Sequence, residues 1–132
     1  MSLAYLAGFF DGEGCVHIQA KPEYKAFSLM VQISQNNPTV LRLFKKRFKG
    51  SLGFYGTSYK YSTSAANAEH LLRTLLPYLK TKRKVAQLAL TYRKMVSMRY
   101  PGVTSRGNTR PAHLTKKMAK LSKEISRLNQ LD

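Results

Sequence analysis

Apolar and polar residues alternate along the chain with a period that changes from helical to strand-like and back. Residues 3–13 place three large apolar side chains on one stripe and small ones on a neighbouring face, which indicates a helix with two packing partners. Residues 15–21 and 26–35 then alternate strictly between apolar and polar positions and predict the two strands of a long hairpin. The chain therefore begins with a helix that leads into paired strands.

The rest of the chain repeats a helix and a hairpin before it continues in helices. The predicted elements are a helix from Pro38 that ends at Gly50, strands over 51–55 and 59–64, a helix over 65–76 and a helix from about 82 to 98. A final helix over 111–131 repeats its apolar residues at alternating spacings of four and three, which suggests packing on a partner surface. Up to residue 98 the resulting order is α-β-β-α-β-β-α-α, which is typical of the α+β class.

The 132 residues suffice for one domain with a single hydrophobic core. We divide them into a core over 1–98, a basic loop or linker over 99–112 and a basic amphipathic helix over 113–132. The helix either belongs to the same domain or is appended to it. The loop is rich in Gly, Ser, Thr, Asn and Arg, a composition that suits a segment ordered by a partner.

The charge of the chain is strongly positive and unevenly distributed. The sequence holds 23 Lys and Arg against 6 Asp and Glu, a net charge of +17, and most of the excess falls in residues 80–132. Such an excess requires an anionic partner, with nucleic acid the first candidate and an anionic membrane surface the second. No apolar run reaches the length of a membrane span and no signal peptide precedes the first helix, so we expect a soluble, intracellular protein of a bacterial or phage cytoplasm or an organelle. The single Cys15 excludes an intrachain disulfide and a cysteine-based zinc site.

The polar faces of the predicted strands carry side chains that suit recognition of base edges. Gln pairs bidentately with adenine and Lys donates to guanine in the major groove, although ordinary solvent exposure explains any one of these residues alone. Strand propensity is a simpler explanation for Tyr59 and Tyr61 than stacking on bases. The candidate DNA-contacting residues are His17, Gln19, Lys21, Lys25, Ser28, Met30, Gln32, Ser34, Tyr59, Tyr61, Lys80, Lys84, Arg106, Arg110, Lys116 and Lys117.

The first helix ends in two acids, Asp11 and Glu13, at the negative end of its dipole. A carboxylate there is disfavoured by roughly 0.3 to 1 kcal/mol unless a cation is present, which is a first indication of a metal. Glycines inside the helix each cost about 1 kcal/mol relative to alanine, so close approach of another helix explains them better than helix stability. This small face comprises Ala4, Ala7, Gly8, Asp11 and Gly12, and a glycine cap at Gly14 explains neither the face nor the acids.

The nonapeptide LAGFFDGEG over residues 6–14 resembles the signature of the LAGLIDADG homing endonucleases. Phe9 and Phe10 replace Leu and Ile, and Gly12 and Glu13 replace Ala and Asp, with the chemical character kept in both cases. The predicted order of elements over residues 3 to about 98 matches the core topology of that family. The resemblance implies an α+β fold with an antiparallel four-stranded DNA-binding sheet and helices on one face.

The resemblance also implies a metal site at the end of the first helix. In the family the second acid of the motif binds a divalent cation with the carbonyl of the preceding residue, which corresponds here to Glu13 and the Gly12 carbonyl. Mg²⁺ or Mn²⁺ is the expected cofactor, with Ca²⁺ binding without supporting cleavage. Glu replaces the commoner Asp, which lengthens the reach of the carboxylate. For Asp11 we favour bracing of the partner's motif helix, with metal binding secondary.

Two more residues correspond to peripheral catalytic positions of the family. Gln35 resembles the polar residue that orients the attacking water, although a hydrogen bond at the strand end explains it equally well. Lys82 resembles the lysine that stabilises charge near the scissile phosphate; a plain phosphate clamp is the alternative, and Lys80 or Lys84 could take its place. Thr39 departs from the basic residue of some relatives, which puts that part of the water network in doubt.

The family resemblance implies a homodimeric, site-specific double-strand DNA endonuclease that cuts a long pseudo-palindromic target. A single motif supplies one principal acid, whereas cutting two strands requires two sites, so two copies must assemble. The alternatives are a non-cleaving DNA- or RNA-binding protein, such as an intron maturase of the same fold, and a basic architectural protein. Three histidines, His17, His70 and His113, are too scattered for a metal constellation.

Overall fold

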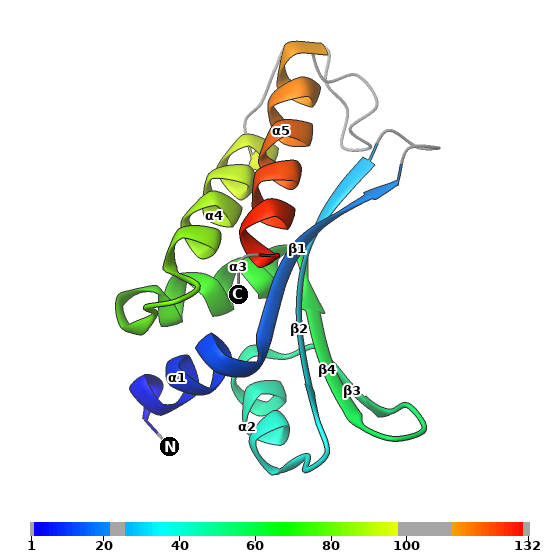
Figure 1. The fold of residues 1–132 in the computed structure, drawn as a ribbon, viewed down its shortest axis with the longest axis vertical. Helices are drawn as coiled ribbons and strands as arrows, with labels where there is room; N and C mark the ends of the chain where they lie inside the picture. The colour runs from blue at the N-terminus through cyan, green and yellow to red at the C-terminus, as the bar shows by residue number, and fades with distance from the viewer. Residues whose placement is uncertain (1, 22–25, 98–111, 131–132) are drawn as a thin grey trace.

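The computed structural model describes residues 2–21, 26–97 and 112–130, arranged as shown in Figure 1. The order of helices and strands confirms the predicted α+β class and topology. The elements are α1 (Leu3–Glu13), β1 (Gly14–Lys21), β2 (Ala26–Gln35), α2 (Thr39–Phe48), β3 (Ser51–Phe54), β4 (Tyr59–Ser64), α3 (Ala65–Leu75), a short 3-10 turn η2 (Leu76–Tyr78), α4 (Arg83–Ser97) and α5 (Ala112–Asn129). The predicted basic loop lies almost wholly outside the described residues.

Four antiparallel strands form one sheet in the order β1-β2-β4-β3. The long β1–β2 hairpin places Gly14 opposite Ile33. Strand β4 lies between β2 and β3, so Lys60 is opposite Ser34 on one side and Gly53 on the other. Because side chains alternate between the two faces of a sheet, one face is apolar and the other polar. Figure 1 shows the helices gathered on one side of this sheet.

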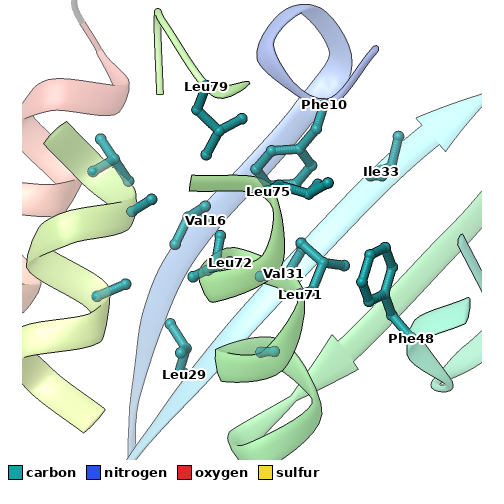
Figure 2. Packing of buried hydrophobic residues seen from close by; sticks show 14 of the residues in the cluster. Phe10, Val16, Leu29, Val31, Ile33, Phe48, Leu71, Leu72, Leu75 and Leu79 are labelled. Carbon is teal, nitrogen blue, oxygen red and sulfur yellow. The ribbon is translucent and has the colours of Figure 1, made fainter. Parts of the chain in front are cut away.

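The hydrophobic core lies between the apolar face of the sheet and the helices. Phe10 of α1, Val16 of β1 and Val31 of β2 are fully buried together with Leu72 and Leu75 of α3. Figure 2 shows these side chains meeting from separate elements. Full burial of such a side chain stabilises the fold by about 1.5 to 3 kcal/mol relative to exposure. The apolar stripe of α1 therefore holds the motif helix against the end of the sheet.

Helix α5 covers the free edge of strand β1. Ser122 Oγ donates to the Ile18 carbonyl at 3.2 Å, and Asn129 Nδ2 donates to the Val16 carbonyl at 2.7 Å. Ile125, on the face of α5 between these two residues, is buried in the common core. An unpaired strand edge can pair with a strand of another molecule. Here Ser122 and Asn129 donate to β1 carbonyls that have no partner strand on this side. The surface on which this last helix packs is thus formed by β1 and α4 of its own chain, as Figure 1 shows.

Candidate active site and nucleic-acid face

The motif helix α1 buries one side and exposes the other. Ser2 begins the helix by accepting a hydrogen bond from the Tyr5 amide at 3.1 Å. The exposed side carries Ala4, Tyr5, Gly8, Gly12 and Glu13. The expectation that Ala7 belongs to this outer, dimer-forming face is corrected, because Ala7 is 0% exposed. The large apolar stripe draws the neighbouring small residue into the chain's own core.

Gly14 is the C-cap of α1, where its amide donates to the Phe10 carbonyl, and a glycine is required there for a reason of space. Its φ of −84° and ψ of 163° are extended, so its backbone conformation does not require glycine. A Cβ at this position would lie 2.3 Å from Cδ2 of Phe10 and 2.8 Å from the Phe10 carbonyl oxygen. Since α1 turns directly into β1, only glycine leaves room for the buried Phe10 ring beside this turn.

The Asp11 carboxylate binds the backbone of its own chain just before α4. Its Oδ2 accepts from the Lys80 amide at 2.8 Å, and its Oδ1 accepts from the Lys82 amide at 3.0 Å. Both amides lie just before α4, near the positive end of its dipole, which favours a negative charge. The brace on the partner's motif helix stays a prediction; within one chain, Asp11 joins the end of α1 to the segment just before α4. Both of its oxygens are engaged there.

Lys82 is brought to the end of the motif helix, although 71 residues separate it from Asp11 in sequence. Its Nζ donates to the Asp11 carbonyl oxygen at 3.1 Å, and the residue is 7% exposed. A cation at the C-terminal end of a helix interacts favourably with the dipole. Lys80 and Lys84, the two lysines that could take the place of Lys82 at the scissile phosphate, are exposed instead. The structure thus singles out Lys82 as the lysine beside the last turn of α1.

Glu13 and Gly12 occupy the exposed tip of α1. Among the described residues no hydrogen bond or ion pair engages the Glu13 carboxylate, whereas Asp11 is occupied by backbone amides. The Gly12 carbonyl belongs to the last turn of α1. The carbonyls of a last turn find no amide donor within their own helix. Nowhere in residues 2–21, 26–97 and 112–130 do three His, Cys, Asp or Glu side chains converge.

Gln35 lies at the same end of the sheet as the tip of α1. It is the last residue of β2, two positions beyond Ile33, whose partner Gly14 directly follows α1. Across β2 and β4 its partner is Tyr59, and its side chain is half-buried. Thr39, which departs from the family pattern, donates its hydroxyl to Asn37 Oδ1 at 2.6 Å and so takes part in capping α2.

The polar sheet face is formed by outward residues of β1, β2, β3 and β4, and we use this name for it below. Several predicted DNA-contacting residues lie on it in register, with His17 opposite Met30 and Gln32 opposite Ser62. The described residues of this face are Cys15, His17, Gln19, Ser28, Met30, Gln32, Ser34, Ser51, Gly53, Lys60, Ser62 and Ser64. Burial, and secondarily the Lys60 cation, lowers the pKa of His17, so the imidazole favours its neutral form. Lys60 and Ser62 are absent from the predicted set.

Tyr59 and Tyr61 lie on the helical side of the sheet, which corrects their prediction as DNA-contacting residues. Tyr61 is 0% exposed, its ring centroid is 5.9 Å from that of Phe44, and its hydroxyl donates to the Lys49 carbonyl. Burial raises the pKa of this hydroxyl to about 12. Tyr59 shares the face by alternation and is half-buried. The period-two pattern of the strand, with aromatics inward and Lys60 outward, is the signal that identifies the correct face.

The remaining predicted contacts lie away from this face or outside the described chain. Lys116 and Lys117 are exposed on α5, which packs at the β1 edge. Lys25, Arg106 and Arg110 lie outside the described residues, and of Lys21 only the backbone is described.

A cavity of about 560 Å³ lies beside the exposed side of α1. Ala4, Gly8 and Asp11 line one wall, and the segment over residues 77–80 together with Arg83 lines the other. A Cβ added at Gly8 or Gly12 would meet nothing within 4 Å, so the surface is open. Tyr78, 46% exposed, is one of the lining residues, and Tyr5 on the exposed side of α1 is 48% exposed. These two tyrosines are exposed apolar groups that sequence periodicity does not identify.

None of the helices in the described part of the chain combines the length and the apolar character that crossing a membrane demands.

The sheet has four antiparallel strands with helices on one side, and the motif helix, which ends in acids, lies at one end of the sheet. This is the architecture of LAGLIDADG homing endonucleases. The family model described as LAGLIDADG endonuclease matches residues 6–98, and the chain belongs to this family. The resemblance seen in the sequence is thereby confirmed. No curated protein sequence matches the chain.

Solved structures show the same fold at low sequence identity. I-CvuI bound to a target DNA in the presence of Mg, with the DNA not cleaved, is 23% identical with a TM-score of 0.78, and the match covers 96% of this chain and 80% of that one. The archaeal intron-encoded homing endonuclease I-Vdi141I with DNA is 16% identical, with a TM-score of 0.73 and coverages of 96% and 82%. The homing endonuclease I-TnaI is 19% identical, with a TM-score of 0.69 and coverages of 98% and 95%.

Proposed function

We propose that this chain is a homodimeric, divalent-metal-dependent endonuclease that cuts both strands of a long, pseudo-palindromic DNA site. The observation that carries the proposal is the exposed, unpaired Glu13 at the end of α1, next to a polar sheet face. Membership of the LAGLIDADG family and the DNA complexes of similar structures support it.

Glu13 and the Gly12 carbonyl are the residues that would hold the metal. Both offer hard oxygen donors at the negative end of a helix, where a cation relieves an unfavourable carboxylate. When bound, Mg²⁺ or Mn²⁺ would neutralise charge on a phosphate and make a bound water more acidic. Complexes of I-CvuI with Mg and with Ca support divalent binding, and we propose that Ca²⁺ binds here without cleavage. Asp11 is secondary, because backbone amides occupy its oxygens.

A twofold dimer would form across the exposed side of α1. The cavity lined by Ala4 and Gly8 offers space for the backbone of a second α1, and the exposed Tyr78 would be covered at the same time. This arrangement brings two Glu13 carboxylates together, and like charges in proximity repel unless cations lie between them. The dimer and the metal thus support each other.

Lys82 and Gln35 are proposed to act around this centre. Lys82 lies beside the last turn of α1, and we infer that its ammonium stabilises negative charge near the scissile phosphate in addition to its bond with the Asp11 carbonyl. Gln35 closes β2 at the same end of the sheet and would orient water. The hydrogen bond from Lys82 to the end of α1 supports this role of Lys82 over that of a plain phosphate clamp.

The test is a cleavage screen against a randomised duplex library with and without Mg²⁺, followed by Glu13→Gln on the selected site. We expect this variant to lose cleavage and to keep DNA binding, because the amide preserves shape but not charge. Glu124→Gln is the matched control, since Glu124 forms its ion pair with Arg127 on α5 and interacts electrostatically with Lys84. Equal cutting by Glu13→Gln and the unmodified chain would remove Glu13 from the metal site.

A second candidate function is nucleic-acid binding without cleavage, including binding of RNA. The observation that favours it is the location of positive charge: α2 exposes Arg42, Lys45, Lys46 and Arg47 away from the polar sheet face. Phosphate contacts from such residues give salt-dependent affinity without sequence preference. A chain that binds RNA tightly but cuts nothing in the library screen would support this candidate over the first.

A further inference from the structure

The tip of the β3–β4 hairpin carries two neighbouring aromatic side chains that are largely exposed. Phe54 is 59% exposed and Tyr55 is 67% exposed. Each forgoes most of the roughly 1.5 to 3 kcal/mol that burial of a large apolar side chain provides. Packing of the core therefore does not explain either ring, and a contact at the surface would.

The two rings lie on opposite faces of the sheet. Phe54 is opposite Tyr59 with ring centroids 5.0 Å apart, which places it on the helical side. Tyr55 instead folds back over Gly53, where an added Cβ would lie 3.2 Å from its Cε2 and 3.3 Å from its Oη. Gly53 is the strand partner of Lys60 and belongs to the polar sheet face. The hydroxyl end of Tyr55 therefore lies over this face, close against the glycine.

The backbone around Tyr55 is fixed by the turn. The Tyr55 amide donates to the Ser58 carbonyl at 2.9 Å, and the Thr57 amide donates to the Tyr55 carbonyl at 2.9 Å. Gly56 supplies the positive φ of 79° that this turn requires. A backbone fixed by such a turn loses little freedom when the segment binds a partner, which favours affinity.

We propose that Tyr55 is a DNA-contacting residue at the outer end of the polar sheet face, where it acts together with Lys60. The inference rests on the proposed function, since it concerns the same face and the same partner. The Tyr55 ring offers apolar surface for a sugar or a thymine methyl group, and its hydroxyl offers a hydrogen bond. The adjacent Lys60 ammonium donates to a phosphate or to a base-edge acceptor. Together they extend readout beyond β1 and β2 to the hairpin tip.

Single tryptophans can report on the two faces separately, because the sequence contains no tryptophan. Tyr55→Trp and Phe54→Trp each introduce one indole, whose quenching by iodide is measured while random-sequence duplex DNA is added in EDTA. We expect DNA to protect the indole in Tyr55→Trp from iodide and to leave the indole in Phe54→Trp accessible. Equal protection at both positions, or at neither, would overturn the proposal.

Affinity provides the second measurement, by fluorescence anisotropy of a labelled duplex. Tyr55→Ala should bind about five- to tenfold more weakly, in the lower part of the range for aromatic contacts with nucleic acids. Tyr55→Phe, which keeps the ring, should lose less, and Phe54→Ala should bind as the unmodified chain does. Unchanged affinity of Tyr55→Ala, with folding verified by circular dichroism, would refute the contact. Absence of DNA binding by the unmodified chain would instead refute the proposed function itself.

Discussion

Replacement of Asp11 by alanine tests the connection between the motif helix and the start of α4. The Asp11 carboxylate accepts two amide hydrogen bonds, at 2.8 and 3.0 Å. Hydrogen bonds to a charged group contribute about 1.5 to 3 kcal/mol each, and partial exposure of Asp11 places these near the lower limit. We therefore expect Asp11→Ala to lower the free energy of unfolding by about 2 to 3 kcal/mol.

The assay is urea denaturation followed by circular dichroism at several protein concentrations. With a slope of about 1 to 3 kcal/mol per molar urea, the midpoint should fall by about 1 to 2 M. Because the contact is within one chain, the loss in unfolding free energy should be the same at every protein concentration. Glu124→Ala, which breaks an exposed ion pair on α5, is the control and should leave the midpoint nearly unchanged.

A dependence of this loss on protein concentration would contradict the intrachain role of Asp11. If Asp11→Ala lost stability only at concentrations at which the unmodified chain is a dimer, the carboxylate would act between subunits. The intrachain bonds to the Lys80 and Lys82 amides would then be secondary to a bond with the partner's motif helix.

Three further substitutions follow from the geometry. Tyr61→Phe should lower the free energy of unfolding, measured by urea denaturation, by about 1 kcal/mol, because the hydroxyl hydrogen bond is lost. It should leave DNA affinity unchanged, and weaker DNA binding would show that Tyr61 contacts DNA after all. Gly14→Ala should destabilise by about 1 to 3 kcal/mol, because its Cβ would collide with the Phe10 ring, and an unchanged midpoint would contradict this close approach. The pKa of His17 is lowered in the fold, so the unfolded chain binds the proton more tightly and stability should fall as pH drops below the ordinary value of 6.5. His17→Gln should flatten that pH dependence in urea titrations, and an identical slope would show that other groups cause it.

The order of the elements could be predicted because each has a local signal. Period-two alternation identifies β1 and β2, and a stripe of leucines identifies α3, without reference to any distant residue. The polar face of the first hairpin follows from the same alternation, since a shift of one residue would turn its apolar set outward. The nonapeptide over residues 6–14 likewise identifies the family, because its small face and acids share one short segment.

The second hairpin shows where local reasoning failed. Its strands contain aromatic residues at inward positions and Lys60 at an outward one, so residue type alone assigned Tyr61 to the wrong face. Aromatic rings suit both a core and a nucleic-acid surface, and packing against Phe44 decides between them. The location of Tyr55 over Gly53 depends on a turn whose geometry is equally invisible in composition.

The sequence by itself determined the family, the succession of helices and strands, the excess of positive charge and the acid at the tip of the motif helix. Only the tertiary structure decided what each acid meets. Asp11 and Lys80 are 69 residues apart in sequence, and the packing of α1 and α3 on one sheet brings them within hydrogen-bonding distance. Glu13, two residues further along, is exposed and has no hydrogen bond or ion pair among the described residues. Periodicity describes one element at a time, whereas the roles of these two carboxylates depend on where three elements converge.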